Sequence, residues 1–262
     1  MMEFLLCIGL GLVAGMLGGL LGIGGSVIMI PALLFFMPNM TIHLAQAIAM
    51  TVNPAVAISS AAKHNKNNNV SWNVVWKVLP LSLICIALAA WFSNSIKGEW
   101  LELAFATFLI WVLWDQLDSI FGTSKITTSS KESTLLQFGA TGGVTGIMAG
   151  LLGIGGGLIQ VPLLNRLCKL PIKQAIGTSS AIMFVTAILG ATVKDASLQK
   201  VDHNAMTAVM QAAQIVPGAL IGGWIGAKLT NVLPSRVIRI VFALLVLIAS
   251  YKLFAGSIPI LF

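Results

Sequence analysis

The hexapeptide Leu20-Leu21-Gly22-Ile23-Gly24-Gly25 occurs twice in this sequence, and its second copy is Leu151-Leu152-Gly153-Ile154-Gly155-Gly156. The two copies lie 131 residues apart, and Pro31 and Pro162 follow them at the same spacing. A fixed offset of this kind indicates an internal repeat, and a repeat sets the architecture before any single element is considered.

The repeat extends well beyond its glycines. Gln46-Ala47-Ile48 returns as Gln174-Ala175-Ile176, and residues 80–96 align without a gap with residues 217–233. A polar stretch rich in Ser and Thr separates the two units. We therefore predict a first membrane repeat at residues 1–121, an inter-repeat loop at 122–134 and a second membrane repeat at 135–262.

The composition places most of the chain in lipid. Of 262 residues, 57% are hydrophobic and 9% are charged, whereas a soluble domain has about 25% charged residues. Apolar runs of about 20 residues are typical of membrane-spanning helices. Eight hydrophobic segments are present, at about 4–37, 44–62, 74–92, 100–117, 135–164, 174–193, 205–229 and 237–254. The sequence thus predicts an all-α, polytopic integral membrane protein with two homologous four-segment repeats.

Several other classes of protein are disfavoured. The net charge of +7 comes from Lys and Arg residues scattered between apolar runs, which is typical of loop charges rather than of a nucleic-acid surface. Three cysteines show no metal or redox spacing. The first glycine turn has neither a preceding strand nor a following Lys-Ser/Thr, as a nucleotide loop would. We predict no enzyme activity, catalytic residue, metal, cofactor or nucleic-acid partner.

Each repeat opens with a helix that glycines break. A single helix over residues 4–37 would be about 50 Å long, against a hydrocarbon core of about 30 Å. Glycine is costly inside a helix and permits other backbone conformations. We expect a break at residues 22–25 and an equivalent one in 135–164. Broken backbone inside a membrane is tolerated only where protein or a water-filled cavity covers it.

Two topologies follow from these breaks. If both broken runs cross the membrane, the protein has eight spans with parallel repeats, and its Lys and Arg residues divide eight to seven between the two sides. If both are re-entrant, the repeats are inverted and the division is eleven to four. The positive-inside rule favours the inverted arrangement, with both termini outside, and inverted repeats around broken helices recur in transporters. Segment lengths alone leave the parallel alternative open.

The glycine turns are candidates for a ligand site. Where a helix restarts after a break, its first backbone N–H groups lack partners and its macrodipole end is positive. Two such helix starts near the bilayer midplane would bind an anion, and Ser26 is expected to cap one of them. The alternative is that these glycines only allow tight helix crossing. Glycines spaced by four at Gly218, Gly222 and Gly226 are expected only to pack, so that Gly222→Ala should be mild.

A second polar cluster, Gly177-Thr178-Ser179-Ser180, lies inside an apolar segment, and its counterpart Ala49-Met50-Thr51-Val52 is followed by Asn53-Pro54. Hydroxyls in a membrane helix often bond only to the preceding turn, but Asn53 beside a proline is costly to leave unpaired in lipid. We predict that both clusters face the glycine turns. The candidate substrate-binding residues are Gly24, Gly25, Ser26, Thr51, Asn53, Gly155, Gly156, Gly157, Gln160, Thr178, Ser179 and Ser180.

The doubled glycine motif, its following proline and the stretch Gln174-Ala175-Ile176-Gly177-Thr178-Ser179-Ser180 resemble the TauE/SafE family of sulfite-exporter-type permeases. The resemblance covers nearly the whole chain. It implies a multi-pass protein of the cytoplasmic membrane that exports a small anion such as sulfite, sulfoacetate or another organosulfonate. The first repeat departs from the family pattern at Met50-Thr51-Val52, where a Thr-Ser pair is expected.

The leading functional hypothesis is therefore a secondary transporter of a small anion that binds near the membrane midplane. A coupling ion or facilitated diffusion is implied, and a homo-oligomer is left open. Two alternatives remain: a carrier of another small solute or oxyanion, and a non-transporting membrane subunit of a larger complex.

Overall fold

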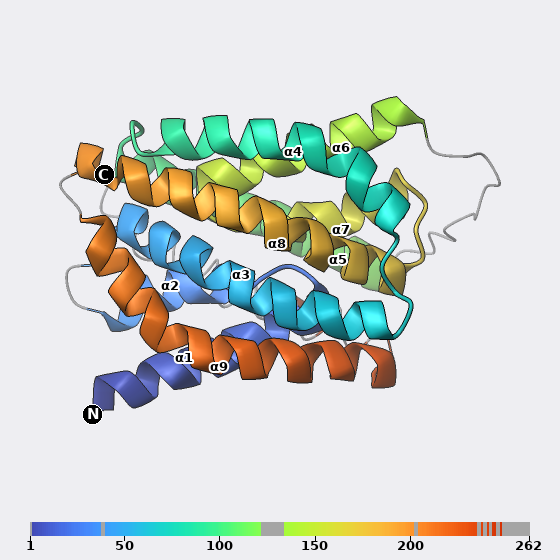
Figure 1. Cartoon of the computed structure of the whole chain (residues 1–262), viewed down its shortest axis with the longest axis horizontal. Coiled ribbons are helices and arrows are strands. Elements are labelled where there is room, and N and C mark those ends of the chain that lie inside the picture. Colours follow the sequence, from blue (N-terminus) through green and yellow to red (C-terminus); the bar gives the residue numbers. More distant parts are fainter. Residues whose placement is uncertain are drawn as a thin grey trace.

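A computed structural model describes residues 2–37, 40–121, 134–201 and 204–234, together with Val237, Ile240, Ala243, Leu244 and Leu247. The described part is helical (Figure 1). Its elements are α1 (Met2–Leu21), α2 (Ser26–Phe36), α3 (Ile42–Lys66), α4 (Trp72–Ser93), α5 (Gly98–Phe121), α6 (Leu135–Leu152), α7 (Gly157–Arg166), α8 (Ile172–Ser197), the 3-10 turn η1 (Leu198–Val201) and α9 (Ala205–Val232). The predicted inter-repeat loop, apart from Thr134, and most of the last apolar segment lie outside the described residues.

Both expected helix breaks are present. The first separates α1 from the short helix α2, and the second separates α6 from α7. Gly24 and Gly155 occupy matching places in the two turns, with φ of 76° and 69°. Only glycine adopts such angles at little cost, so the repeated glycines of the sequence determine where each helix stops.

The glycines spaced by four bring pairs of helices together. On α1, Gly11 lies against Ile215 and Gly19 against Gly223 of α9. On α6, Gly142 lies against Val78 and Gly150 against Ala90 of α4 in the same manner. In both pairs the residue numbers rise together, so the two helices run in the same direction. The absence of a side chain lets the two backbones touch, as small residues do in membrane helix pairs.

Helices α3 and α8 pack against each other at the centre and run in opposite directions. Met50 lies beside Gly190 near one end of the pair, and the Ser60 and Ser180 hydroxyls are 3.0 Å apart near the other. Because α3 and α8 correspond in the predicted repeats, their opposed directions support the inverted arrangement. The repeat boundaries and the inversion stay predictions.

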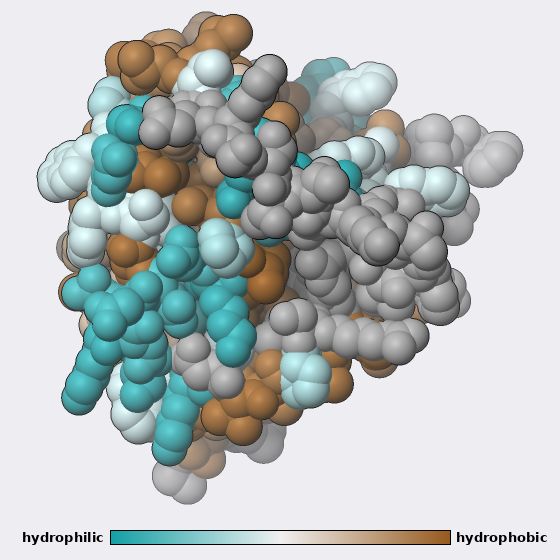
Figure 2. Space-filling view, turned by 90° about the vertical axis from the view of Figure 1, so that its right-hand side faces the viewer, coloured by the Kyte–Doolittle hydropathy of each residue, from teal (hydrophilic) through white to brown (hydrophobic). Residues whose placement is uncertain are grey.

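The bundle has two chemically different ends. At the basic end α1, α3 and α9 finish and α4, α6 and α8 begin; at the Lys194 end these helices do the reverse. Seven described Lys and Arg residues lie at or near the basic end, against three at the other: Lys63, Lys66, Lys77, Arg166, Lys169, Lys173 and Lys228, against Lys97, Lys194 and Lys200. Figure 2 views the basic end, where hydrophilic side chains gather in one area.

Within the described part, six helices are long and apolar enough to cross a membrane: α1, α3, α4, α6, α8 and α9. Exposed aromatic and aliphatic side chains cover their outer faces, among them Trp76, Leu88, Ile221 and Trp224. Lipid tails are as apolar as these side chains, so their exposure is the expected state of a membrane protein. The prediction of an all-α, multi-pass membrane protein is confirmed.

Candidate functional site

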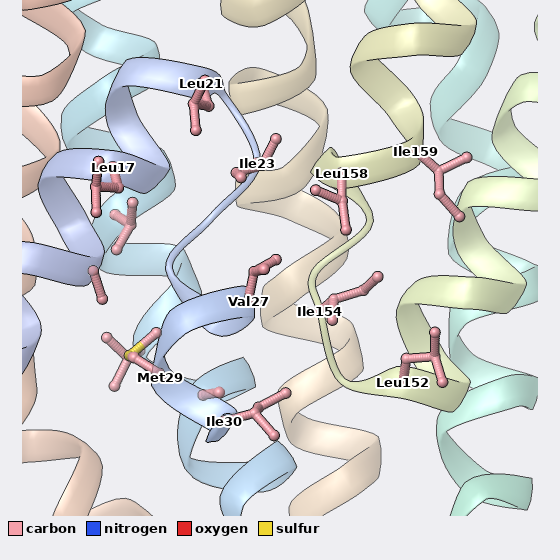
Figure 3. Close-up of a cluster of buried hydrophobic side chains, with 14 of the residues drawn as sticks. Leu17, Leu21, Ile23, Val27, Met29, Ile30, Leu152, Ile154, Leu158 and Ile159 are labelled. Atoms are coloured by element: carbon pink, nitrogen blue, oxygen red, sulfur yellow. The ribbon is translucent and has the colours of Figure 1, made fainter. Parts of the chain in front are cut away.

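The two glycine turns lie side by side in the middle of the bundle (Figure 3). They run in opposite directions, because Gly157 contacts Gly22 and Ile23, whereas Gly24 and Gly155 both border the side chain of Asn53. A Cβ atom on Gly157 would lie 2.5 Å from the Gly22 carbonyl oxygen and from the Cα of Ile23. The glycine at position 157 therefore allows two stretches of backbone to meet where a side chain would separate them.

Asn53 is the central polar side chain of the site. Its Oδ1 accepts a hydrogen bond from the Gly25 N–H at 3.2 Å, and its Nδ2 donates to the Ser26 hydroxyl at 2.6 Å. Asn53 and Ser26 are both fully buried. The amide thus satisfies polar groups that would be costly to leave unpaired in lipid. Five predicted residues, Gly24, Gly25, Ser26, Asn53 and Gly155, are brought together here.

A second polar group joins the other side of the turns. The Ser179 hydroxyl lies 2.9 Å from the Gly22 carbonyl oxygen and 3.0 Å from Oε1 of Gln160. Ser179 is fully buried, and Gln160 is 2% exposed. With one proton, the hydroxyl can donate to only one of these two oxygens at a time. Ser179 and Gln160 therefore lie where the sequence predicted them, beside the turns.

Helices α2 and α7 both begin at this site. The N–H groups of Ser26, Val27, Gly157 and Leu158 find no hydrogen-bond acceptor among the described residues. Gly156 precedes α7 with φ of 84°. Because glycine has no side chain, α7 starts without a side-chain cap. Ser26 does not cap α2 either, and that expectation is wrong: Ser26 is the first helical residue, and its hydroxyl accepts from Asn53 instead.

Three predicted residues lie elsewhere. Thr178 accepts a hydrogen bond from the Ser71 N–H in the α3–α4 connection, and Ser180 contacts Ser60 at the basic-end side of the turns. Thr51 donates to Oδ2 of Asp195 at 3.0 Å, toward the Lys194 end. The expectation that both clusters face the glycine turns thus holds for Ser179 and for the adjoining Asn53, but not for these three residues. Adjacent helical residues point about 100° apart, so a run of three cannot meet one partner.

The sequence reasoning missed a buried group beside the second turn. Lys194 donates to Oε1 of Gln46 at 2.8 Å and to the Ser93 hydroxyl. Gln46 in turn donates to the Leu151 carbonyl oxygen at 3.4 Å. Gln46 was visible in the sequence only as a marker of the repeat, and Lys194 was read as a loop charge. No pattern in the sequence pairs them.

An apolar pocket of about 620 Å³ lies between α5, α6 and α7. None of the predicted site residues lines it, although Ile159 next to Gln160 does. Its lining includes Trp100, Phe108, Trp111 and Met148. Its lining is largely hydrophobic, and the hydroxyl of its one threonine, Thr107, already donates to the Leu103 carbonyl oxygen, so the glycine turns remain the candidate site.

Comparison with known proteins agrees with the resemblance in the sequence. The family described as sulfite exporter TauE/SafE matches residues 7–253. The chain is 25% identical over 272 residues to MamO of Magnetospirillum gryphiswaldense, covering 89% of this chain and 42% of MamO. It is 26% identical to a protein of Haemophilus influenzae over 95% of this chain and 97% of that one. A protein of Methanocaldococcus jannaschii is 30% identical over 72% of each chain.

All three relatives are named probable membrane transporter proteins. The chain spans about two fifths of the length of the two MamO proteins that it matches. No solved structure matches it. The family match covers the glycine turns, Asn53, Ser179 and nearly all of the described helices. The predicted resemblance is confirmed: the chain belongs to the sulfite exporter TauE/SafE family.

Proposed function

We propose that this protein is a secondary membrane transporter that binds a small anion between the two glycine turns. The observation that carries the proposal is the convergence of two helix starts, α2 and α7, in one fully buried place. Each start has N–H groups without an acceptor among the described residues. Backbone N–H groups and the positive end of a helix dipole together bind anions.

The side chains around the turns fit an anion of low charge density. Asn53, Ser26 and Ser179 supply amide and hydroxyl donors, and none of the predicted site residues is acidic. In a site away from water such donors act more strongly than in solution. Sulfite or a sulfonate, whose oxygens accept several hydrogen bonds, would match them. This substrate class and its export come from the family resemblance and are part of the proposal.

The burial of the site corresponds to an occluded state, in which neither membrane face reaches the turns. An alternating-access carrier passes through such a state as one repeat moves against the other. We place the basic end in the cytoplasm, because seven of the ten described Lys and Arg residues lie there. A coupling ion and a homo-oligomer stay predictions, and so do the alternatives of another small solute and of a non-transporting subunit.

Flux into liposomes of purified protein tests the proposal. Gly156→Val should abolish sulfite or sulfoacetate transport, since a β-branched residue is strained at φ of 84° and would reshape the start of α7. Gly143→Ala in the preceding helix α6 is the control, because the added Cβ would have a Leu81 side-chain atom as its nearest neighbour, at an ordinary 3.5 Å. Both variants are compared at matched insertion and with monodisperse elution in detergent.

Normal flux by a well-folded Gly156→Val protein would contradict the anion site and would mean that the glycine turns only allow the backbones to pack closely. Absence of flux from the wild-type protein across sulfite, sulfonates, sulfate and carboxylates would favour the non-transporting subunit.

A further inference from the structure

Lys194 is a fully buried lysine in a chain with few charges. It lies in the last turn of α8 and has no exposed surface. Its ammonium group donates to Oε1 of Gln46 on α3 at 2.8 Å and to the Ser93 hydroxyl on α4. Three helices therefore enclose this cation. The proposed function makes no use of it.

The position of Lys194 would ordinarily let it avoid burial. A lysine near the end of a membrane helix usually extends its chain to the interface and keeps its charge in water. Lys66, which corresponds to Lys194 in the predicted repeats, is exposed at the end of α3. The Lys194 side chain instead points inward to Gln46 and Ser93, so it is held where its charge is costly.

Among the described residues no carboxylate contacts the Lys194 ammonium, and the adjacent Asp195 attracts it only through space. Both hydrogen-bond acceptors of the ammonium are neutral. Asp195 is the neighbouring acid, but its Oδ2 accepts from Thr51, and its buried Oδ1 has no partner in the described part. Buried charges are normally paired. An ammonium whose hydrogen-bond acceptors are both neutral can still bind an anion directly.

Lys194 is also connected to the glycine turns. Gln46, its acceptor, donates to the carbonyl oxygen of Leu151, the next-to-last residue of α6. A Cβ atom on Gly153 would lie 2.7 Å from Cβ and Cγ of Gln46, so the α6–α7 turn begins directly against this side chain. One residue, Gln46, thus separates the buried cation from the proposed anion site.

We propose that Lys194, with Gln46 and Ser93, forms a second anion subsite between the α6–α7 turn and the Lys194 end of the bundle. Its ligand is a small oxyanion or sulfonate, which supplies a negative charge in direct contact with the ammonium. The neutral acceptors hold the ammonium when the subsite is empty, and the anion replaces one of them as it passes between the turns and the membrane surface. This subsite rests on the proposed function and adds a charged step to it.

Equilibrium binding of sulfite to purified protein in detergent tests the subsite. Lys194→Gln should raise the sulfite Kd by about tenfold or more, because a charge-assisted hydrogen bond and its Coulomb attraction are lost. Lys194→Arg should keep the Kd within about threefold, since it retains the charge. Lys66→Gln is the matched control and should leave the Kd unchanged. The melting temperature without ligand is measured for each protein.

The two proposals fail in different ways. Equal sulfite affinity of Lys194→Gln and wild type would overturn the subsite alone, and a fall in melting temperature with that unchanged affinity would make Lys194 a structural residue. The subsite predicts the reverse: weaker binding with an unliganded melting temperature that is unchanged or higher, because replacing a buried charge that no carboxylate contacts by a neutral amide removes its desolvation cost. Wild-type protein that binds neither sulfite, sulfoacetate, sulfate nor phosphate would overturn both proposals.

Discussion

The two ends of the bundle use corresponding residues in different ways. In the predicted repeats Gln46 corresponds to Gln174, and Lys194 corresponds to Lys66. At the Lys194 end, Gln46 and Lys194 are buried and bonded to each other. At the basic end, Lys66 is exposed and Gln174 is half-buried. The two predicted repeats therefore share a backbone arrangement, but corresponding side chains differ in burial and in hydrogen bonding.

The difference has a local cause. Helix α3 ends at Lys66, whereas α8 continues for three residues beyond Lys194 to Ser197. At the basic end the Thr230 hydroxyl donates directly to the Leu20 carbonyl oxygen at 2.7 Å. At the Lys194 end the corresponding carbonyl, that of Leu151, receives the amide of Gln46 instead. The helix-end carbonyl thus accepts from a threonine hydroxyl at the basic end. At the Lys194 end it accepts from the Gln46 amide, which is itself hydrogen-bonded to a lysine.

The largest effect expected is an all-or-none difference in side-specific labelling. In a variant whose three cysteines are replaced by alanine, Asn67→Cys at the basic end should react only with cytoplasmic reagent. Gln199→Cys, in the turn after α8 at the other end, should react only from outside, whereas parallel repeats would put it on the same side as Asn67. Both positions are exposed. The wild-type control should react little, because Cys7 and Cys168 are buried, burial raises the pKa of the Cys168 thiol, and the half-buried Cys85 lies in the middle of α4, away from both ends. Labelling of both introduced cysteines from the same side would contradict the inverted topology.

An intermediate effect is expected for the glutamines. Gln46→Leu should lower the free energy of unfolding by about 2 kcal/mol, because it removes a hydrogen bond to a buried charged group. The corresponding change Gln174→Leu, at a half-buried residue, should stay within about 0.5 kcal/mol. Reversible unfolding in mixed micelles measures both. Equal losses would mean that the two ends are energetically alike and that the comparison fails.

A smaller effect is expected at Thr230. Thr230→Val keeps the shape of the side chain and removes its bond to Leu20, which should cost about 1 kcal/mol in the same unfolding assay. Sulfite affinity should not change, because Thr230 lies at the basic end, away from the proposed subsite. A Thr230→Val protein with wild-type stability would show that this hydroxyl does not hold α1 to α9.

Much of the fold could be predicted from the sequence, because glycine and hydrophobicity mark it directly. The breaks at residues 22–25 and 153–156 follow from backbone angles that other residues resist. Asn53 could be placed because an amide beside a proline in lipid must find partners, and Gly25 and Ser26 are those partners.

The rest of the site depends on facts that residue order does not contain. The apolar run that ends just before Lys194 predicts a loop at this residue, but α8 continues past it and the side chain is buried. Gly222 was expected to tolerate alanine, yet a Cβ atom there would collide with the Leu12 carbonyl oxygen. Glycines spaced by four are where backbones touch, so a packing role does not make such a residue replaceable.

The pairing of α1 with α9 has a consequence for how the protein is made. The first helix ends at Leu21, and the helix that fills its glycine face begins at Ala205. At ribosomal rates of about 5–20 residues per second, α1 waits roughly ten seconds or longer in the membrane before its partner emerges. During that time its bare glycine face meets only lipid or the insertion machinery. The packing of α1 is therefore a late event, which waits until α9 has been made.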